Sequence, residues 1–123
     1  IQRDFAAKGV QLIAINANDA AGYPEDGFDN MVRRAQKKSY NFPYLRDETQ
    51  RTARAYGAEY TPEAFVLNSR GELRYVGRVD DNWQNPDKAK FHNLRDAIEA
   101  ILAHKKVENP FTHAIGCTIK WRM

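Results

Sequence analysis

YTPEAFVLNSRGELRYVG, residues 60–77, carries the clearest structural pattern of this chain. Two short apolar runs flank Asn68-Ser-Arg-Gly71, a sequence typical of the turn between antiparallel strands. Proline cannot donate a hydrogen bond to a strand ladder, so Pro62 is expected at the first position of a strand. The pattern therefore predicts a hairpin with strands over 63–68 and 73–79. At this position the Thr61-Pro62 peptide can adopt the cis form, an isomer that proline tolerates.

The segments on either side of the hairpin alternate between helix and strand patterns. In chain order we expect a helix end over 1–8, a strand over 10–16, a helix over 25–38, a strand over 42–47, a helix over 49–56, the hairpin, and a helix over 88–104. Helices that alternate with strands predict an α/β domain. Its sheet is expected to be mixed, parallel except at the hairpin.

Several details of these elements are specific predictions. The run over 10–16 is almost wholly apolar, which is typical of a strand covered on both faces. In the helix over 49–56, Ala53 and Tyr56 are expected to face inward. Asp87 follows Pro86 and is expected to cap the N-terminus of the last helix.

Length and charge limit the class of protein. A chain of 123 residues corresponds to one domain, 1–123. Its tail over 105–123 is expected to be irregular, with residues 117–121 as either a short strand or an anchoring segment. The net charge is +3, and the densest basic run, 33–38, is read as a solvated helix face, so no nucleic-acid partner is expected. No apolar run has the length of a membrane span, and no membrane association is expected. The expected compartment is the cytoplasm, and the alternative is export by a signal segment ahead of Ile1.

Candidate chemistry is sparse. Cys117 is the single cysteine, so it is either a small packed residue or a redox thiol whose pKa His113 would lower. Asp80-Asp81-Asn82-Trp83 suggests a capped loop rather than a metal site, because no glycine-spaced calcium loop follows. His92 and His104 stand too far apart for a helical metal pair. We therefore expect neither a metal nor a cofactor.

Five segments together resemble thioredoxin-like proteins of the AhpC/TSA (alkyl hydroperoxide reductase/thiol-specific antioxidant) branch. They are Val10–Asn18, Phe42–Thr49, Tyr56–Pro62, Gly77–Trp83 and Ile115–Trp121. The last two resemble a bacterial subgroup of uncharacterised members. The resemblance implies a thioredoxin-like mixed sheet with flanking helices, here without its N-terminal strand.

The resemblance also implies where the chemistry of such a protein lies. In the family a redox cysteine, or a Cys-x-x-Cys pair, opens a helix of which residues 1–8 would be the far end, so the attacking cysteine would precede Ile1. Thr61 and Pro62 would form the cis-proline loop, whose backbone binds a partner strand. Members of the subgroup often carry a cysteine where this chain has Tyr60, which cannot perform thiol chemistry.

Two functions remain open from the sequence. The first is a thiol-disulfide oxidoreductase or thiol peroxidase, with a disulfide or peroxide substrate, a thiol reductant, and Cys117 as a resolving thiol; these 123 residues would be inactive alone. The second is a non-catalytic thioredoxin-like module that binds peptides beside Tyr60, Thr61 and Pro62. Without the N-terminal strand, the exposed strand edges also suggest a homo-oligomer formed by strand pairing.

Overall fold

The computed structural model describes residues 1–82 and 85–122. They form two compact units, one of residues 1–58 together with the C-terminal residues from Ile119, and one of residues 59–118. The first unit contains α1 (Gln2–Phe5), β1 (Ala14–Asn16), α2 (Phe28–Lys37), β2 (Tyr44–Arg46) and α3 (Arg51–Tyr56). The second contains β3 (Tyr60–Thr61), β4 (Ala64–Leu67), β5 (Leu73–Gly77), α4 (Asn93–Leu102) and β6 (Cys117–Thr118).

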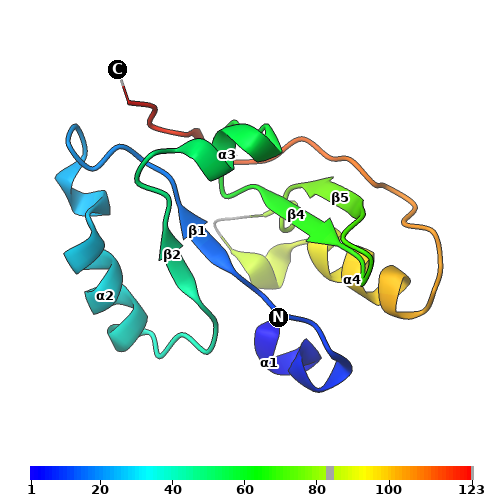
Figure 1. The fold of residues 1–123 in the computed structure, drawn as a ribbon. Helices are drawn as coiled ribbons and strands as arrows, with labels where there is room; N and C mark the ends of the chain where they lie inside the picture. Colours follow the sequence, from blue (N-terminus) through cyan, green and yellow to red (C-terminus); the bar gives the residue numbers. More distant parts are fainter. Residues whose placement is uncertain (83–84, 123) are drawn as a thin grey trace. The chain divides into compact units, whose positions relative to one another are not determined.

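β1 and β2 form a parallel pair in the first unit. Ala14 pairs with Tyr44 and Asn16 with Arg46, and α2 lies beside the pair (Figure 1). The parallel arrangement predicted for these two segments is confirmed. A connection between parallel strands requires a crossover, and α2 supplies it.

β1 is shorter than the predicted strand over 10–16. The side chain of Gln2 donates a hydrogen bond to the Val10 carbonyl at 2.8 Å and accepts one from the Leu12 N–H. The backbone of residues 10–12 is therefore satisfied by a side chain of α1 rather than by a neighbouring strand. The strand ladder begins only at Ala14, whose N–H donates to the Pro43 carbonyl at 3.0 Å.

The expectation that this strand is covered on both faces is wrong. Ile13, Ile15 and Leu45 remain 50%, 45% and 48% exposed. Ile15 and Leu45 are register partners, so they lie on the same face of the two-stranded sheet. Only the opposite face, with the partly buried Ala14 and Tyr44, is covered within this unit.

The helices of the first unit follow the sequence pattern with small shifts. The helix predicted over 25–38 is α2, and a separate 3-10 turn over Pro24–Asp26 precedes it. α3 buries Ala53 as predicted, and the carboxylate of Asp47 accepts the Ala53 N–H at 2.8 Å near the start of this helix. Tyr56 is exposed, so its predicted inward position is wrong.

The predicted hairpin is confirmed in the second unit. β4 and β5 are antiparallel, with Ala64 opposite Gly77 and an irregular register near Leu67. The Oδ1 of Asn68 accepts the N–H groups of Arg70 and Glu72, both at 3.0 Å, which closes the turn. α4 packs against the hairpin (Figure 1). The buried side chains of Tyr75, Ala97 and Val107 form the core of this unit.

α4 begins at Asn93 rather than at residue 88. The N–H groups of Lys90 and Phe91 donate to the carboxylate of Asp81 at 2.8 and 3.1 Å, which holds this segment in a loop. Asp87 lies in a 3-10 turn over Pro86–Lys88, so its prediction as the helix N-cap is wrong.

The tail from residue 105 carries more regular structure than its sequence indicates. The Val76 N–H donates to the Pro110 carbonyl and the Thr112 N–H donates to the Val76 carbonyl, both at 3.0 Å. Residues 110–112 therefore run beside β5, and Phe111 forms a parallel bridge with Val76. The strand predicted near 117–121 is present as β6. Among the described residues, no helix has both the length and the apolar character needed to cross a membrane.

Candidate functional site

The turn from β3 into β4 contains a cis peptide bond between Thr61 and Pro62, the isomer that the family resemblance implies. Thr61 and Pro62 are exposed, whereas Tyr60 is half-buried. The carboxylate of Glu63 accepts the backbone N–H groups of Glu59 at 2.9 Å and Tyr60 at 3.3 Å. Glu63 thus stabilises the turn through hydrogen bonds to its backbone. Sequence reasoning overlooked this residue, although a carboxylate directly after Thr-Pro was the available signal.

Cys117 lies directly beside this turn. β6 pairs with β3 in antiparallel register, with Thr118 opposite Tyr60 and Cys117 opposite Thr61. Side chains of directly opposed residues in an antiparallel pair project from the same face, with Cβ atoms roughly 4.5–5.5 Å apart. The thiol is exposed. Cys117 is therefore brought to the consecutive candidate residues Tyr60, Thr61 and Pro62, from which it is distant in the sequence.

Gly116 makes this approach possible. A Cβ atom at this position would collide with the Thr61 carbonyl oxygen and would lie 3.1 Å from the Pro62 ring. Its conformation is one that other residues can adopt, so the requirement for glycine is purely steric. Every larger residue would push β6 away from β3.

A buried hydroxyl network fixes the tail before it reaches β6. The Tyr75 hydroxyl donates to the Arg78 carbonyl at 2.6 Å and lies 2.7 Å from Thr112 Oγ1, which accepts the Arg78 N–H at 3.0 Å. Burial raises the pKa of Tyr75, and the hydrogen bond with Thr112 partly opposes that rise. The absence of a side chain at Gly77 allows the tail to approach β5, because a side chain there would collide with Thr112.

The other sequence candidates lie outside this arrangement. The ring of His113 packs edge-on against Phe111 at 5.5 Å, and the described residues include no hydrogen bond between His113 and Cys117. His92 stands just before α4 and His104 just after its end, both exposed. Within the described part of the chain, no group of three or more His, Cys, Asp or Glu side chains could hold a metal ion.

The carboxylates of the acidic loop at 80–82 accept hydrogen bonds from nearby backbone N–H groups. Asp80 accepts the Asn82 N–H at 2.9 Å, and Asp81 accepts the N–H groups of Phe91 and Lys90. These bonds lower the pKa of Asp81, the one from Phe91 most strongly. Both carboxylates therefore serve the loop, as the capped-loop reading expects. Trp83 lies outside the described residues.

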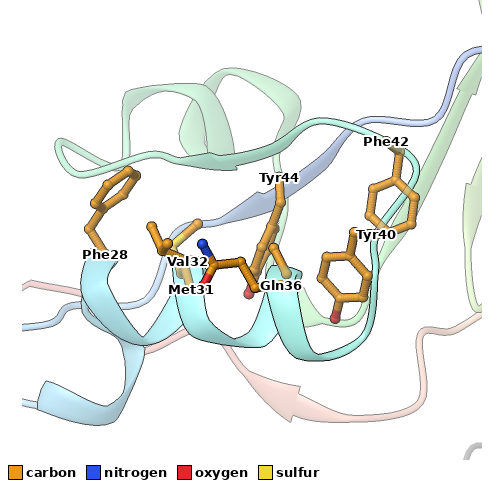
Figure 2. A pocket seen from close by; sticks show the side chains of 8 residues that line it. Phe28, Met31, Val32, Gln36, Tyr40, Phe42 and Tyr44 are labelled. Carbon is orange, nitrogen blue, oxygen red and sulfur yellow. The ribbon is translucent and has the colours of Figure 1, made fainter.

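The first unit holds a groove of a different character (Figure 2). Its volume is about 230 Å³ and its walls are mostly apolar. It is lined by Phe28, Met31, Val32, Ala35, Gln36, Tyr40, Phe42 and Tyr44. The rings of Tyr40 and Phe42 stack at 4.8 Å, which orders its rim. With no thiol, carboxylate or imidazole in its walls, the groove is not a candidate for redox chemistry.

Comparison with known proteins gives a family and a fold. The model of the AhpC/TSA family matches residues 1–76, which include the cis-proline turn. No curated protein matches the chain. An uncharacterized conserved protein from Geobacillus kaustophilus has a similar solved structure, with 39% identity and a TM-score of 0.90 over 98% of this chain. A hypothetical protein from Sinorhizobium meliloti is similar at 37% identity and a TM-score of 0.87, also over 98% of this chain.

The chain spans 65% and 66% of the lengths of those two solved structures. The family model ends before the tail with Cys117, whereas each structure match covers 98% of this chain. The resemblance inferred from the sequence is confirmed. The chain belongs to the AhpC/TSA family and has a thioredoxin-like α/β fold.

Proposed function

We propose that this chain supplies the cis-proline side of the active site in a thiol-disulfide oxidoreductase or a thiol peroxidase. Membership of the AhpC/TSA family supports a redox function in general. The finer proposal is carried by one observation, the pairing of Cys117 with Thr61. It puts an exposed thiol opposite the residue that begins the cis peptide.

In this proposal the attacking cysteine lies outside these 123 residues, because the chain has a single cysteine. The attacking thiolate breaks the O–O bond of a peroxide, becomes a sulfenic acid and releases water or an alcohol. The Cys117 thiol then attacks the sulfenic sulfur, which forms a disulfide and releases water. Two equivalents of an external thiol reduce that disulfide and leave as a disulfide themselves.

With a disulfide substrate the same residues take equivalent roles. The attacking thiolate displaces one sulfur of the substrate as a thiol and forms a mixed disulfide with the other. Cys117 attacks the sulfur of the attacking cysteine in this mixed disulfide and releases the second substrate thiol. Thr61 and Pro62 present the backbone that orients the substrate strand, and Tyr60 contributes packing but no thiol chemistry.

The first test uses the 123-residue chain. With hydrogen peroxide and dithiothreitol it is expected to show no turnover beyond the slow oxidation of a single thiol. Sustained peroxide consumption that is lost in Cys117→Ser would overturn the proposal, because the whole site would then lie within these residues.

The second test uses the longer gene product that contains this chain. After stoichiometric peroxide, peptide mass mapping without reductant is expected to find Cys117 in a disulfide with the attacking cysteine. Cys117→Ser is expected to leave that cysteine as a sulfenic acid that dimedone traps, whereas the control Thr118→Ser keeps the disulfide. A Cys117 thiol that stays reduced throughout turnover would refute the resolving role.

One observation favours a second candidate, a non-catalytic peptide-binding module. β3 already accepts a strand, β6, through backbone pairing that needs no thiol chemistry. For such a module, the longer gene product would be inert toward peroxides and disulfides and would still bind extended peptides. The test on the longer gene product therefore separates the candidates, because a module would form no disulfide at Cys117 after peroxide.

A further inference from the structure

The strand edge beside the cis peptide is occupied by the chain itself. β3 has only two residues, and among the described residues it pairs only with β6. While β6 stays in this position, the edge of β3 that carries Thr61 is unavailable to any other strand. A substrate or partner that binds this edge must therefore displace β6.

The segment around β6 is fixed at both ends and weakly held between them. We call residues 113–118 the strap. Before the strap, Thr112 accepts the Arg78 N–H at 3.0 Å. After it, the Lys120 N–H donates to Asn18 Oδ1 and the Asp19 N–H donates to the Lys120 carbonyl, both at 2.8 Å.

Within the strap, the two-residue ladder with β3 and the close contact at Gly116 are the interactions with the cis-proline turn. No side-chain hydrogen bond of residues 113–118 is present in the described part of the chain. A two-residue ladder provides few contacts. A segment tethered at both ends nevertheless acts as an intramolecular ligand, at an effective concentration on the order of millimolar. The strap therefore competes through its tethering rather than through many contacts.

We propose that the strap is an internal competitor for an extended peptide on β3, and that it displays the kind of strand that this edge accepts. This inference rests on the proposed role of the cis-proline turn as a substrate-binding edge. The partner is a strand in antiparallel register with a glycine immediately before the residue opposite Thr61, because the Thr61 carbonyl and the Pro62 ring leave no room for a side chain there. In the strap, the residue that faces Thr61 is the exposed Cys117.

The apparent affinity for a peptide is proportional to the fraction of molecules in which the edge is free, so a small free fraction weakens binding. The native chain is therefore expected to bind such a peptide weakly. A variant that releases the strap is expected to bind it at least tenfold more tightly.

The probe is a fluorescent peptide that copies residues 114–120 with Cys117→Ser, used in reducing buffer with the 123-residue chain. The releasing variant is Gly116→Val, whose side chain collides with the Thr61 carbonyl. The matched control is Ile115→Val, which keeps the glycine and is expected to bind like the native chain. A second peptide that also carries Gly116→Val is expected to bind none of the three proteins.

A locking variant makes the test independent of how well Gly116→Val folds. Opposed residues of an antiparallel pair have Cα atoms about 4.5–5.5 Å apart, which suits a disulfide. Thr61→Cys is therefore expected to form a disulfide with Cys117 on mild oxidation. In the oxidised form peptide binding is expected to disappear, and reduction is expected to restore it.

Equal peptide affinity of the native chain and folded Gly116→Val would overturn the proposal. So would equal affinity of oxidised and reduced Thr61→Cys, or equal binding of the two peptides. These readouts involve no turnover, so they are independent of the redox tests. A longer gene product that is inert toward both peroxides and disulfides refutes the enzyme and leaves the strap, whereas failed peptide competition refutes the strap and leaves the enzyme.

Discussion

Two glycines of the second unit lie where any side chain would collide with another segment of that unit. A side chain on Gly77 would meet Thr112, including its N atom at 2.9 Å, and Gly77 also has a φ of +149°, which other residues rarely adopt. A side chain on Gly116 would meet Thr61. The route of the tail from β5 to β3 therefore depends on these two residues, and the thiol of Cys117 reaches the cis-proline turn because both are glycines.

The buried hydroxyl of Tyr75 gives a prediction at the scale of one residue. Tyr75→Phe removes two hydrogen bonds and leaves the Arg78 carbonyl and Thr112 with fewer partners, so it is expected to cost about 1–2 kcal/mol of unfolding free energy at neutral pH. Denaturant unfolding of the native chain and the variant measures this cost. Tyr23→Phe, which alters an exposed tyrosine, is the control and is expected to cost little.

The same pair of proteins predicts a pH dependence. Burial raises the pKa of Tyr75 above the value near 10 that it has in the unfolded chain. A group with a raised folded-state pKa contributes stability that is complete below the unfolded pKa and is lost as the pH rises through the folded one. The stability gap between the native chain and Tyr75→Phe is therefore expected to narrow above pH 10. A stability gap that stays constant from about pH 8 to about pH 11, an interval that spans the ordinary pKa of tyrosine, would contradict this assignment.

At the scale of elements, one glutamine of the first unit holds the C-terminal segment. The side chain of Gln50, only 2% exposed, donates to the Ala17 and Lys120 carbonyls at 2.8 and 2.9 Å and accepts the Arg122 N–H at 2.9 Å. Beside it, the guanidinium of Arg54 lies 4.6 Å from the ring centroid of Trp121. The conspicuous residues at the end of the chain thus bind the N-terminal side of α3.

Gln50→Ala is expected to destabilise the chain by about 1–3 kcal/mol, because it leaves buried backbone groups without partners. It is also expected to speed tryptic cleavage after Lys120, since the backbone there loses its restraint. Denaturant midpoints and timed proteolysis measure the two effects. The control Gln36→Ala changes an exposed glutamine of α2 and is expected to alter neither; equal behaviour of the two variants would refute the role of Gln50.

Local sequence patterns predicted elements well where local forces determine them. The hairpin follows from Asn68 and Gly71, α2 follows from its apolar spacing, and α3 ends at the predicted Gly57. The errors came from side chains that act over a longer range. The Gln2 side chain forms hydrogen bonds with the backbone of Val10 and Leu12, so the strand begins later than its pattern indicates. The Asp81 carboxylate accepts the N–H groups of Lys90 and Phe91, so the last helix also begins later.

For the whole molecule, the sequence named the members of the candidate site but not their geometry. Thr61 and Pro62 stood out through their hairpin and the family resemblance, and Cys117 as the only thiol. Their proximity depends on strand pairing between residues 61 and 117, which no local pattern encodes. Glu63, Thr112 and Gln50 were missed for the same reason, since each acts through contacts with backbone. That the two compact units form one domain stays a prediction.

The exposed apolar residues of the first unit predict how the 123-residue chain behaves in solution. Ile13, Ile15 and Leu45 are each about half exposed, and among the described residues β1 pairs along one edge only. Apolar patches and free strand edges promote association between copies. Ile15→Lys puts a charge in the middle of this face and is expected to shift the chain toward the monomer in sedimentation velocity. Leu73→Lys, which changes an equally exposed leucine at the start of β5, is the control and is expected to sediment like the native chain. A native chain that remains monomeric at all concentrations, or equal effects of the two substitutions, would show that this face does not drive association.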